Sequence, residues 1–116
     1  MSLLEELIES GVNVDEALER FMNNAALYER MLGKLVDAVN STEVMPAFEA
    51  QDYETALTNA HTLKGVMGNL SITPLYSAYT DIVRLLREDK PEQARKVLEE
   101  VLPVQEKIIA CIERYK

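Results

Sequence analysis

Cysteine and histidine are almost absent from the sequence: each occurs once among 116 residues, as Cys111 and His61. A single cysteine cannot form a disulfide within the chain, and a metal site needs several His, Cys or carboxylate ligands. Cys111 lies in an apolar helical pattern, which predicts a small core residue. We therefore expect neither a metal centre nor a catalytic pair between Cys111 and His61.

Glycine and proline are also scarce, with four residues each, and tryptophan is missing. No segment shows the period-two alternation of a β-strand, whereas Ala, Leu and Glu, which favour helix, are abundant. A phosphate-binding loop is absent, so we do not expect the chain to bind ATP as a kinase does. Residues 65–68 formally match the GXXG loop that clamps nucleic acids, but they lie inside a helical pattern.

Positively charged residues are few: the chain has 12 Lys and Arg against 20 Asp and Glu, which gives a net charge of −8. This imbalance argues against nucleic acid or an anionic membrane as a partner. No apolar run approaches the roughly 18 residues of a membrane span, and acids stand at the N-terminus where a signal peptide needs bases. We expect a cytoplasmic protein with one domain over residues 1–116, and the lack of linkers at its ends favours a stand-alone protein.

Capping residues and apolar spacing predict two short helices at the start of the chain. The first is amphipathic, contains Leu3 and Leu7, and should be stopped by Gly11. The second should be capped by Asn13 and run to about Met22.

The middle of the chain predicts a longer helix, a short one and another long one. Asn24 offers a cap for the helix near residues 25–40. Thr42 is expected to cap the short segment, which has Pro46 in its first turn, where proline is tolerated. Asp52 is expected to cap the helix that follows.

The last two predicted helices begin at proline. Thr73 should cap the first of them and Pro74 should occupy its first helical position. Pro91 should start the second, which contains Pro103 in its interior. Since an interior proline removes a backbone hydrogen bond and bends the axis, we expect a kink there or two abutting helices.

Four of the predicted helices are long and span residues near 25–40, 52–71, 74–88 and 91–115. Their connections are short, so neighbouring helices should run antiparallel. We therefore expect an all-α fold: an antiparallel up-and-down four-helix bundle, with the two short N-terminal helices packed against it as a lid.

His61 lies in the 52–71 segment, away from the apolar side of that helix. At roughly 100° per residue, one narrow arc collects the apolar residues Ala56, Ala60, Leu63, Met67 and Leu70. His61 falls well outside this arc and is predicted to be exposed, among Glu54, Leu57, Lys64, Gly65 and Gly68. An interior glycine costs about 1 kcal/mol relative to alanine. Two glycines on an outward face therefore indicate that something large approaches it.

The stretch from His61 to Gly65, which reads His-Thr-Leu-Lys-Gly and is followed by Gly68-Asn69-Leu70, resembles the motif of histidine phosphotransfer (HPt) domains of bacterial and fungal phosphorelays. The resemblance extends to residues 11–22 and to Leu27-Tyr28, so it covers most of the chain. The family usually has glycine where this chain has Ser71, at the end of the motif helix. The family also places the lid near that helix.

The resemblance implies that His61 is a phosphoacceptor. A neutral imidazole has a free nitrogen lone pair, and the phosphoramidate it forms is labile, so the group can move on. Lys64 would place a positive charge near the phosphoryl oxygens. Gly65 and Gly68 would leave room for a partner, and Leu57 and Thr58 are candidate docking contacts.

The resemblance further implies a passive phosphocarrier rather than an enzyme. Its partners would be the receiver domain of a response regulator, a hybrid histidine kinase, or both. The receiver would bring the aspartate, the Mg²⁺ and most of the catalysis, so the chain needs no cofactor of its own. We expect it to act as a monomer.

Two other interpretations compete with this one. A degenerate HPt-like module could dock a receiver or kinase without carrying phosphate, although both His61 and Lys64 are intact. A helical scaffold without a phosphorelay link would bind no receiver at all. Acid-labile rather than acid-stable phosphate incorporation separates the carrier from the docking module.

Overall fold

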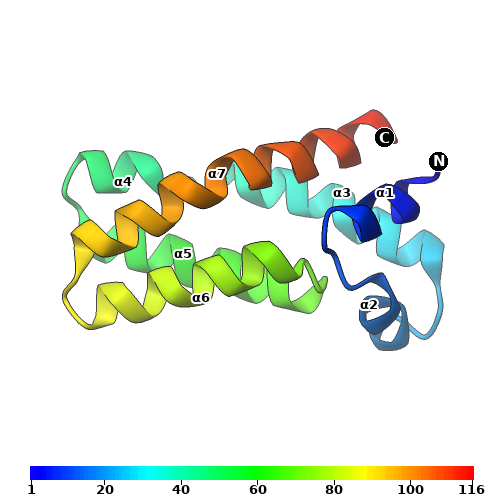
Figure 1. The fold of residues 1–116 in the computed structure, drawn as a ribbon, viewed down its shortest axis with the longest axis horizontal. Coiled ribbons are helices and arrows are strands. Elements are labelled where there is room, and N and C mark those ends of the chain that lie inside the picture. Colours follow the sequence, from blue (N-terminus) through cyan, green and yellow to red (C-terminus); the bar gives the residue numbers. More distant parts are fainter.

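The computed structural model describes residues 1–116 and contains seven helices and no strand (Figure 1), which confirms the all-α prediction. The four longer helices are α3 (Ala25–Ser41), α5 (Tyr53–Asn69), α6 (Thr73–Arg87) and α7 (Pro91–Arg114). The three shorter helices are α1 (Leu3–Glu9), α2 (Val14–Arg20) and α4 (Met45–Glu49).

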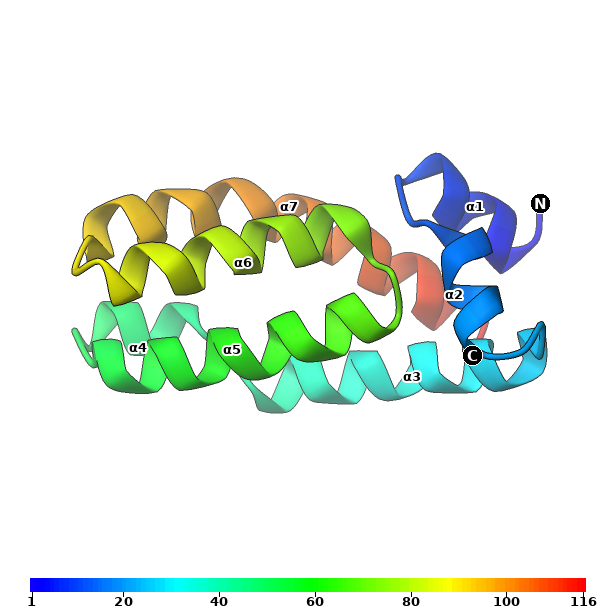
Figure 2. The same ribbon diagram turned by 90° about the horizontal axis from the view of Figure 1, so that it is seen from below.

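The longer helices contact one another in a closed ring: α3 with α5, α5 with α6, α6 with α7, and α7 with α3. They lie along the long axis of a molecule that measures 40 × 24 × 21 Å (Figures 1 and 2). Helices α1 and α2 lie at the end where both chain termini are found, and α4 lies at the other end. Helix α1 contacts α7, and α2 contacts α3.

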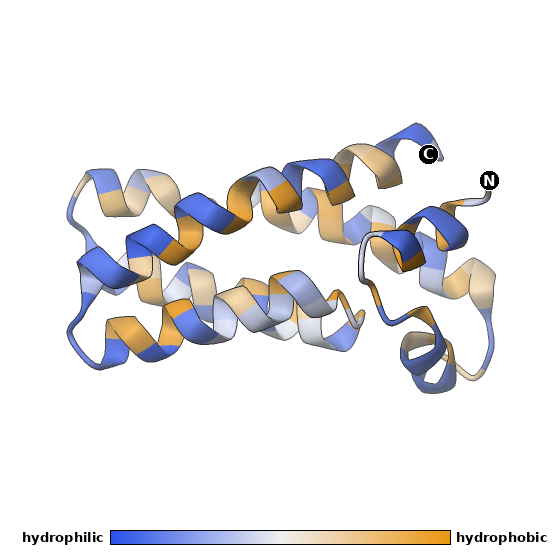
Figure 3. Ribbon diagram, in the orientation of Figure 1, coloured by the Kyte–Doolittle hydropathy of each residue, from blue (hydrophilic) through white to orange (hydrophobic).

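One apolar core runs through the ring, because each longer helix turns one side inward. Figure 3 shows hydrophobic and hydrophilic residues alternating around α3 and α7, as expected of helices with one buried side. Cys111 is buried in this core, as its apolar spacing predicted. None of the seven helices combines the length and the apolarity that crossing a membrane requires.

Three of the predicted caps are present. Side-chain oxygens of Asn13, Asn24 and Asp52 accept the backbone N–H groups of Glu16, Leu27 and Thr55 at 3.1, 3.0 and 3.2 Å. Each of these bonds satisfies one donor that the first helical turn leaves free. The starts of α2, α3 and α5 therefore follow from residues that the sequence displays.

Two other cap predictions are wrong. Thr42 ends α3, and Val44 precedes α4 without a side-chain cap, because two residues separate Thr42 from the first turn of α4. Thr73 is the first residue of α6 and not its cap. Its hydroxyl donates to the carbonyl oxygen of Ser71 at 3.3 Å instead.

One further boundary differs from the prediction, and one open alternative is decided. Helix α2 ends at Arg20 and not near Met22, because Met22 and Asn23 adopt φ angles of 56° and 60°. Helix α7 runs without a break through Pro103, so of the two predicted alternatives, a kink or two abutting helices, the second is excluded. Figure 2 shows the axis of α7 changing direction part-way along its length, as expected of a helix with an interior proline.

Candidate functional site

His61 is the central residue of α5, with eight helical residues on either side. Ala60 and Leu63 beside it are buried at 0% and 1% exposure, whereas His61 itself is exposed, as predicted. No hydrogen bond or ion pair engages the imidazole. The side chain is therefore open to a reactant from solvent.

Lys64 lies one helical turn after His61 and is half-buried. The six ion pairs of the molecule all use other cations. Residues three apart on a helix are neighbours, so the ammonium group has the reach to meet an anion held at His61. Its positive charge is not neutralised within the chain.

Gly65 and Gly68 share the side of α5 that carries His61, but their surroundings differ. A Cβ atom added to Gly65 would meet nothing within 4 Å. A Cβ atom added to Gly68 would lie 2.7 Å from Cε1 of Tyr76. Gly68 thus has a packing reason inside the molecule, because only glycine lets the Tyr76 ring approach this closely. A role of Gly68 towards a partner stays a prediction.

The two candidate docking residues are placed differently as well. Leu57 is half-buried and packs against the core, whereas Thr58 is exposed. The Thr58 carbonyl accepts the hydroxyl of Thr62 at 3.0 Å, a bond within α5. Contact of either residue with a partner stays a prediction.

Two residues that the sequence analysis did not single out border the same face. Tyr76 projects from the first turns of α6 and is 41% exposed. Lys34 of α3 lines an open groove of about 640 Å³ together with Thr62 and Gly65. Their proximity depends on which helices flank α5. The sequence offers only a weak signal for Tyr76, its position just after the motif helix.

The C-terminal end of α5 is held in a defined conformation by Ser71. Ser71 has a φ angle of 56°, its N–H donates to Gly68 O at 3.2 Å, and the N–H of Ile72 donates to Met67 O at 2.9 Å. These are the two bonds of a Schellman motif, in which glycine is the usual left-handed residue. A serine in that conformation costs about 1–2 kcal/mol, and a contact of its side chain offsets part of this cost.

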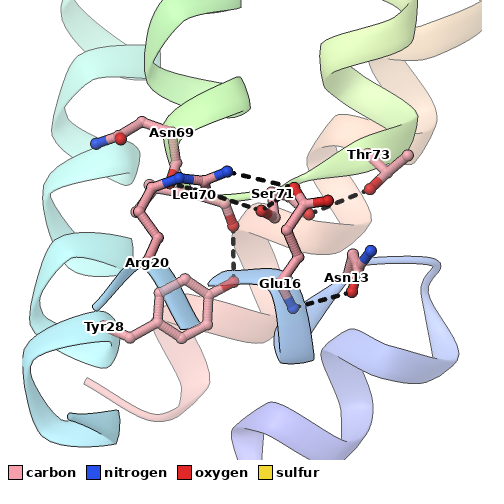
Figure 4. A network of polar contacts seen from close by, with 8 residues as sticks. All are labelled: Asn13, Glu16, Arg20, Tyr28, Asn69, Leu70, Ser71 and Thr73. Atoms are coloured by element: carbon pink, nitrogen blue, oxygen red, sulfur yellow. Dashed lines mark hydrogen bonds and ion pairs between the residues drawn. The ribbon is translucent and has the colours of Figure 1, made fainter. Parts of the chain in front are cut away.

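Helix α2 provides that contact (Figure 4). The Ser71 hydroxyl donates to Glu16 Oε1 at 2.7 Å, and Arg20 Nη1 donates to Ser71 Oγ at 3.0 Å and to Asn69 O at 2.8 Å. The bond from Ser71, followed by the bond from Arg20, holds the pKa of the Glu16 carboxyl below its usual value. A guanidinium beside the last carbonyls of a helix also complements the helix dipole.

Helix α3 adds a buried bond to the same end. The Tyr28 hydroxyl donates to Leu70 O at 2.8 Å, and burial raises the pKa of Tyr28 to about 12. Together these contacts anchor one end of α5 to α2 and α3, so the helix that carries His61 is anchored while its central outward face stays free.

No group of three or more His, Cys, Asp and Glu side chains is placed to hold a metal ion. Comparison of the chain with protein-family models, with curated proteins and with solved structures gives no match.

Proposed function

We propose that the chain is a histidine phosphotransfer protein, a cytoplasmic carrier that moves a phosphoryl group reversibly between His61 and the aspartate of a receiver domain. The observation that carries the proposal is the position of the only histidine: exposed, unpaired, and central on a helix with Lys64 one turn away. The ring of α3, α5, α6 and α7 is proposed to be an antiparallel up-and-down bundle, with α1 and α2 as its lid.

The chemistry requires few groups from this chain. A lone pair of the His61 imidazole attacks the phosphorus of an aspartyl phosphate, the bond from phosphorus to the aspartate oxygen breaks, and the aspartate leaves as a carboxylate. Phosphoryl transfer of this kind depends on positioning and on charge stabilisation. Lys64 supplies positive charge at the phosphoryl oxygens, and Mg²⁺ comes with the receiver. The carrier has neither a cofactor nor an ATP site of its own.

The face around His61 suits the approach of a second protein. Gly65 presents no side chain, and the open groove beside it continues to Lys34 of α3. We assign Gly65 and Gly68 to partner approach and Leu57 and Thr58 to docking. A receiver domain, alone or within a hybrid histidine kinase, is the proposed partner, and the carrier acts as a monomer.

A transfer assay tests the proposal. The protein is incubated with ATP alone and with a panel of receiver domains carrying labelled aspartyl phosphate. We expect no label from ATP and one acid-labile, base-stable phosphoryl group from a cognate receiver. His61→Gln should abolish uptake while changing the free energy of unfolding by less than about 0.5 kcal/mol, since an exposed side chain contributes little to the fold.

Lys64→Ala should slow transfer or shorten the lifetime of the phosphohistidine without abolishing uptake, because a stabilising charge is lost and the nucleophile remains. Receiver binding without any transfer would favour the docking module. Acid-stable label, or label that persists in His61→Gln, would contradict the phosphocarrier.

A further inference from the structure

A second feature of the molecule lies on the side of α5 that faces away from His61. It is an open groove of about 510 Å³ formed by the end of α3, the connection to α4, α4 itself and α7. Leu63 lines this groove, and on a helix it points roughly 160° away from His61, two residues earlier. The groove is therefore separate from the face proposed for phosphotransfer.

The groove has an apolar floor and an elongated shape. Val39, Met45, Leu102 and Ile109 line it as partly buried residues at the edge of the core. Along α7 it reaches from Leu98 to Glu113, which at 1.5 Å per residue is about 22 Å. This length matches an elongated polypeptide segment of three or four helical turns better than a compact small molecule.

Charge of one sign surrounds the floor. Glu43, Glu49, Glu106 and Glu113 line the groove, and no Lys, Arg or His does. None of the four carboxylates takes part in an ion pair. Glu106 and Glu113 are seven residues apart, so they lie on the same side of α7, about 10 Å from each other. An occupant with positive charges at the same spacing would complement them.

A buried polar group also opens into the groove. Gln105 is only 7% exposed, and its Oε1 accepts the hydroxyl of Tyr79 at 2.5 Å. Its amide nitrogen donates no hydrogen bond within the chain, and no fully buried side-chain nitrogen or oxygen lacks a partner. The amide nitrogen is therefore not fully enclosed, and because Gln105 lines the groove, it offers a donor to an occupant.

We propose that this groove docks a lysine- or arginine-rich amphipathic helix of a partner protein. Apolar side chains of that helix fill the floor, and its cations pair with the four glutamates, which is the helix-in-groove mode of recognition. A second copy of this chain is disfavoured as the occupant by its net charge of −8. The proposal goes beyond phosphotransfer, because the docked helix leaves His61 uncovered.

The test uses a synthetic fluorescent peptide with leucines along one helical stripe and lysines flanking it at seven-residue spacing. A second peptide carries glutamates in place of the lysines. Fluorescence anisotropy should show that the lysine peptide binds and that the glutamate peptide does not. Changing Glu43, Glu49, Glu106 and Glu113 together to Gln should weaken binding by about tenfold or more.

The matched control changes Glu19, Glu29, Glu92 and Glu100 together to Gln, which alters the net charge equally but leaves the groove intact. This variant should bind the lysine peptide within about twofold of the original protein. Equal weakening of both variants would show that the attraction is only the overall charge and would overturn the proposal, as would equal binding of the glutamate peptide.

A single substitution tests whether the open space of the groove is needed for binding. Ala110 is exposed on α7 and lines the groove, and arginine is a good helix former, so Ala110→Arg should fold normally and block binding of the lysine peptide. Unchanged binding would contradict the proposal.

Sedimentation equilibrium tests the other occupant. A dimer that Ala110→Arg dissociates would show that a second copy of the chain fills the groove and would overturn the proposal. None of these measurements uses phosphate, so their result is independent of the proposed phosphotransfer.

Discussion

At the scale of single residues, the two glycines near His61 lie in different surroundings. Gly65 faces open space, whereas Gly68 faces the ring of Tyr76. The cost of an interior glycine is the same at both positions, about 1 kcal/mol relative to alanine. Only the structure shows that one of them is compensated by packing inside the chain.

Gly65→Gln should raise stability and reduce transfer. A side chain fits at this position and improves helix propensity, so the free energy of unfolding in urea should rise by roughly 0.5 kcal/mol. Transfer from a receiver should fall strongly, because the new side chain lies one turn from His61. Gly33→Gln on α3 is the control, since its Cβ would make only an ordinary contact of 3.5 Å with Lys116. Normal transfer by Gly65→Gln would remove the steric role of the glycine.

Gly68→Ala should be less stable than Gly65→Ala, because the new methyl group would lie 2.7 Å from the Tyr76 ring. In a Tyr76→Ala background the obstacle is gone, and Gly68→Ala should then stabilise the protein by about 1 kcal/mol. The original protein, Gly68→Ala, Tyr76→Ala and the double variant form a double-mutant cycle measured by urea unfolding. Additive effects would mean that Tyr76 is not the reason for glycine at position 68.

Tyr28 should make stability fall at high pH. Burial raises its pKa in the folded protein to about 12, above the value of about 10 expected in the unfolded chain. The contribution is therefore complete below pH 10 and is lost as the pH rises from 10 towards 12, because the unfolded chain releases its proton first.

Between pH 8 and pH 11 the original protein should lose about 1 kcal/mol more stability than Tyr28→Phe, which has no hydroxyl to ionise. At pH 8 the variant should be the less stable of the two, because Leu70 O loses its donor. Parallel pH curves in urea unfolding would show that Tyr28 does not titrate differently in the two states.

At the scale of elements, helix ends decide how α5 is held. Three residues that follow helices have positive φ angles of 56° to 60°, although none is glycine: Gln51, Ser71 and Asp89. After α5 the left-handed residue also forms side-chain bonds to α2. Helix α2 and the end of the His61 helix are thereby connected.

Two substitutions of Ser71 should separate the effect of its side-chain hydrogen bonds from the effect of its positive φ angle. Ser71→Ala loses the bonds to Glu16 and Arg20 and keeps the unfavourable φ angle, whereas Ser71→Gly loses the same bonds and relieves the angle. The glycine variant should therefore be more stable than the alanine variant by about 1 kcal/mol in urea unfolding. Equal stability of the two variants would contradict the strained conformation.

The same elements show what could be read from the sequence. The caps at Asn13, Asn24 and Asp52 were predictable because each acts within one turn of its own helix. The exposure of His61 followed from helical periodicity for the same reason. The contact between Gly68 and Tyr76 was not predictable, because it joins different helices and depends on how they pack. The groove formed by α3, α4 and α7 was not predictable for the same reason, because it too depends on how different helices pack.

At the scale of the whole molecule, the C-terminal end of α5 and its middle differ in their surroundings. Contacts of α2 and α3 fix the end of α5, while the exposed histidine lies at the centre of the helix. The groove formed by α3, α4 and α7 lies on the other side of α5. The partner proposed for His61 and the helix proposed for the groove would therefore not compete for one surface.

We propose that His61, and no other residue, carries the phosphoryl group. The most direct measurement is mass spectrometry under alkaline conditions, with fragmentation that retains phosphohistidine, on protein loaded by a phosphorylated receiver. We expect a single phosphoryl group on His61 that disappears after brief acid treatment. A phosphoryl group on a serine, threonine or aspartate, or a protein that stays unmodified with every receiver to which it binds, would contradict it.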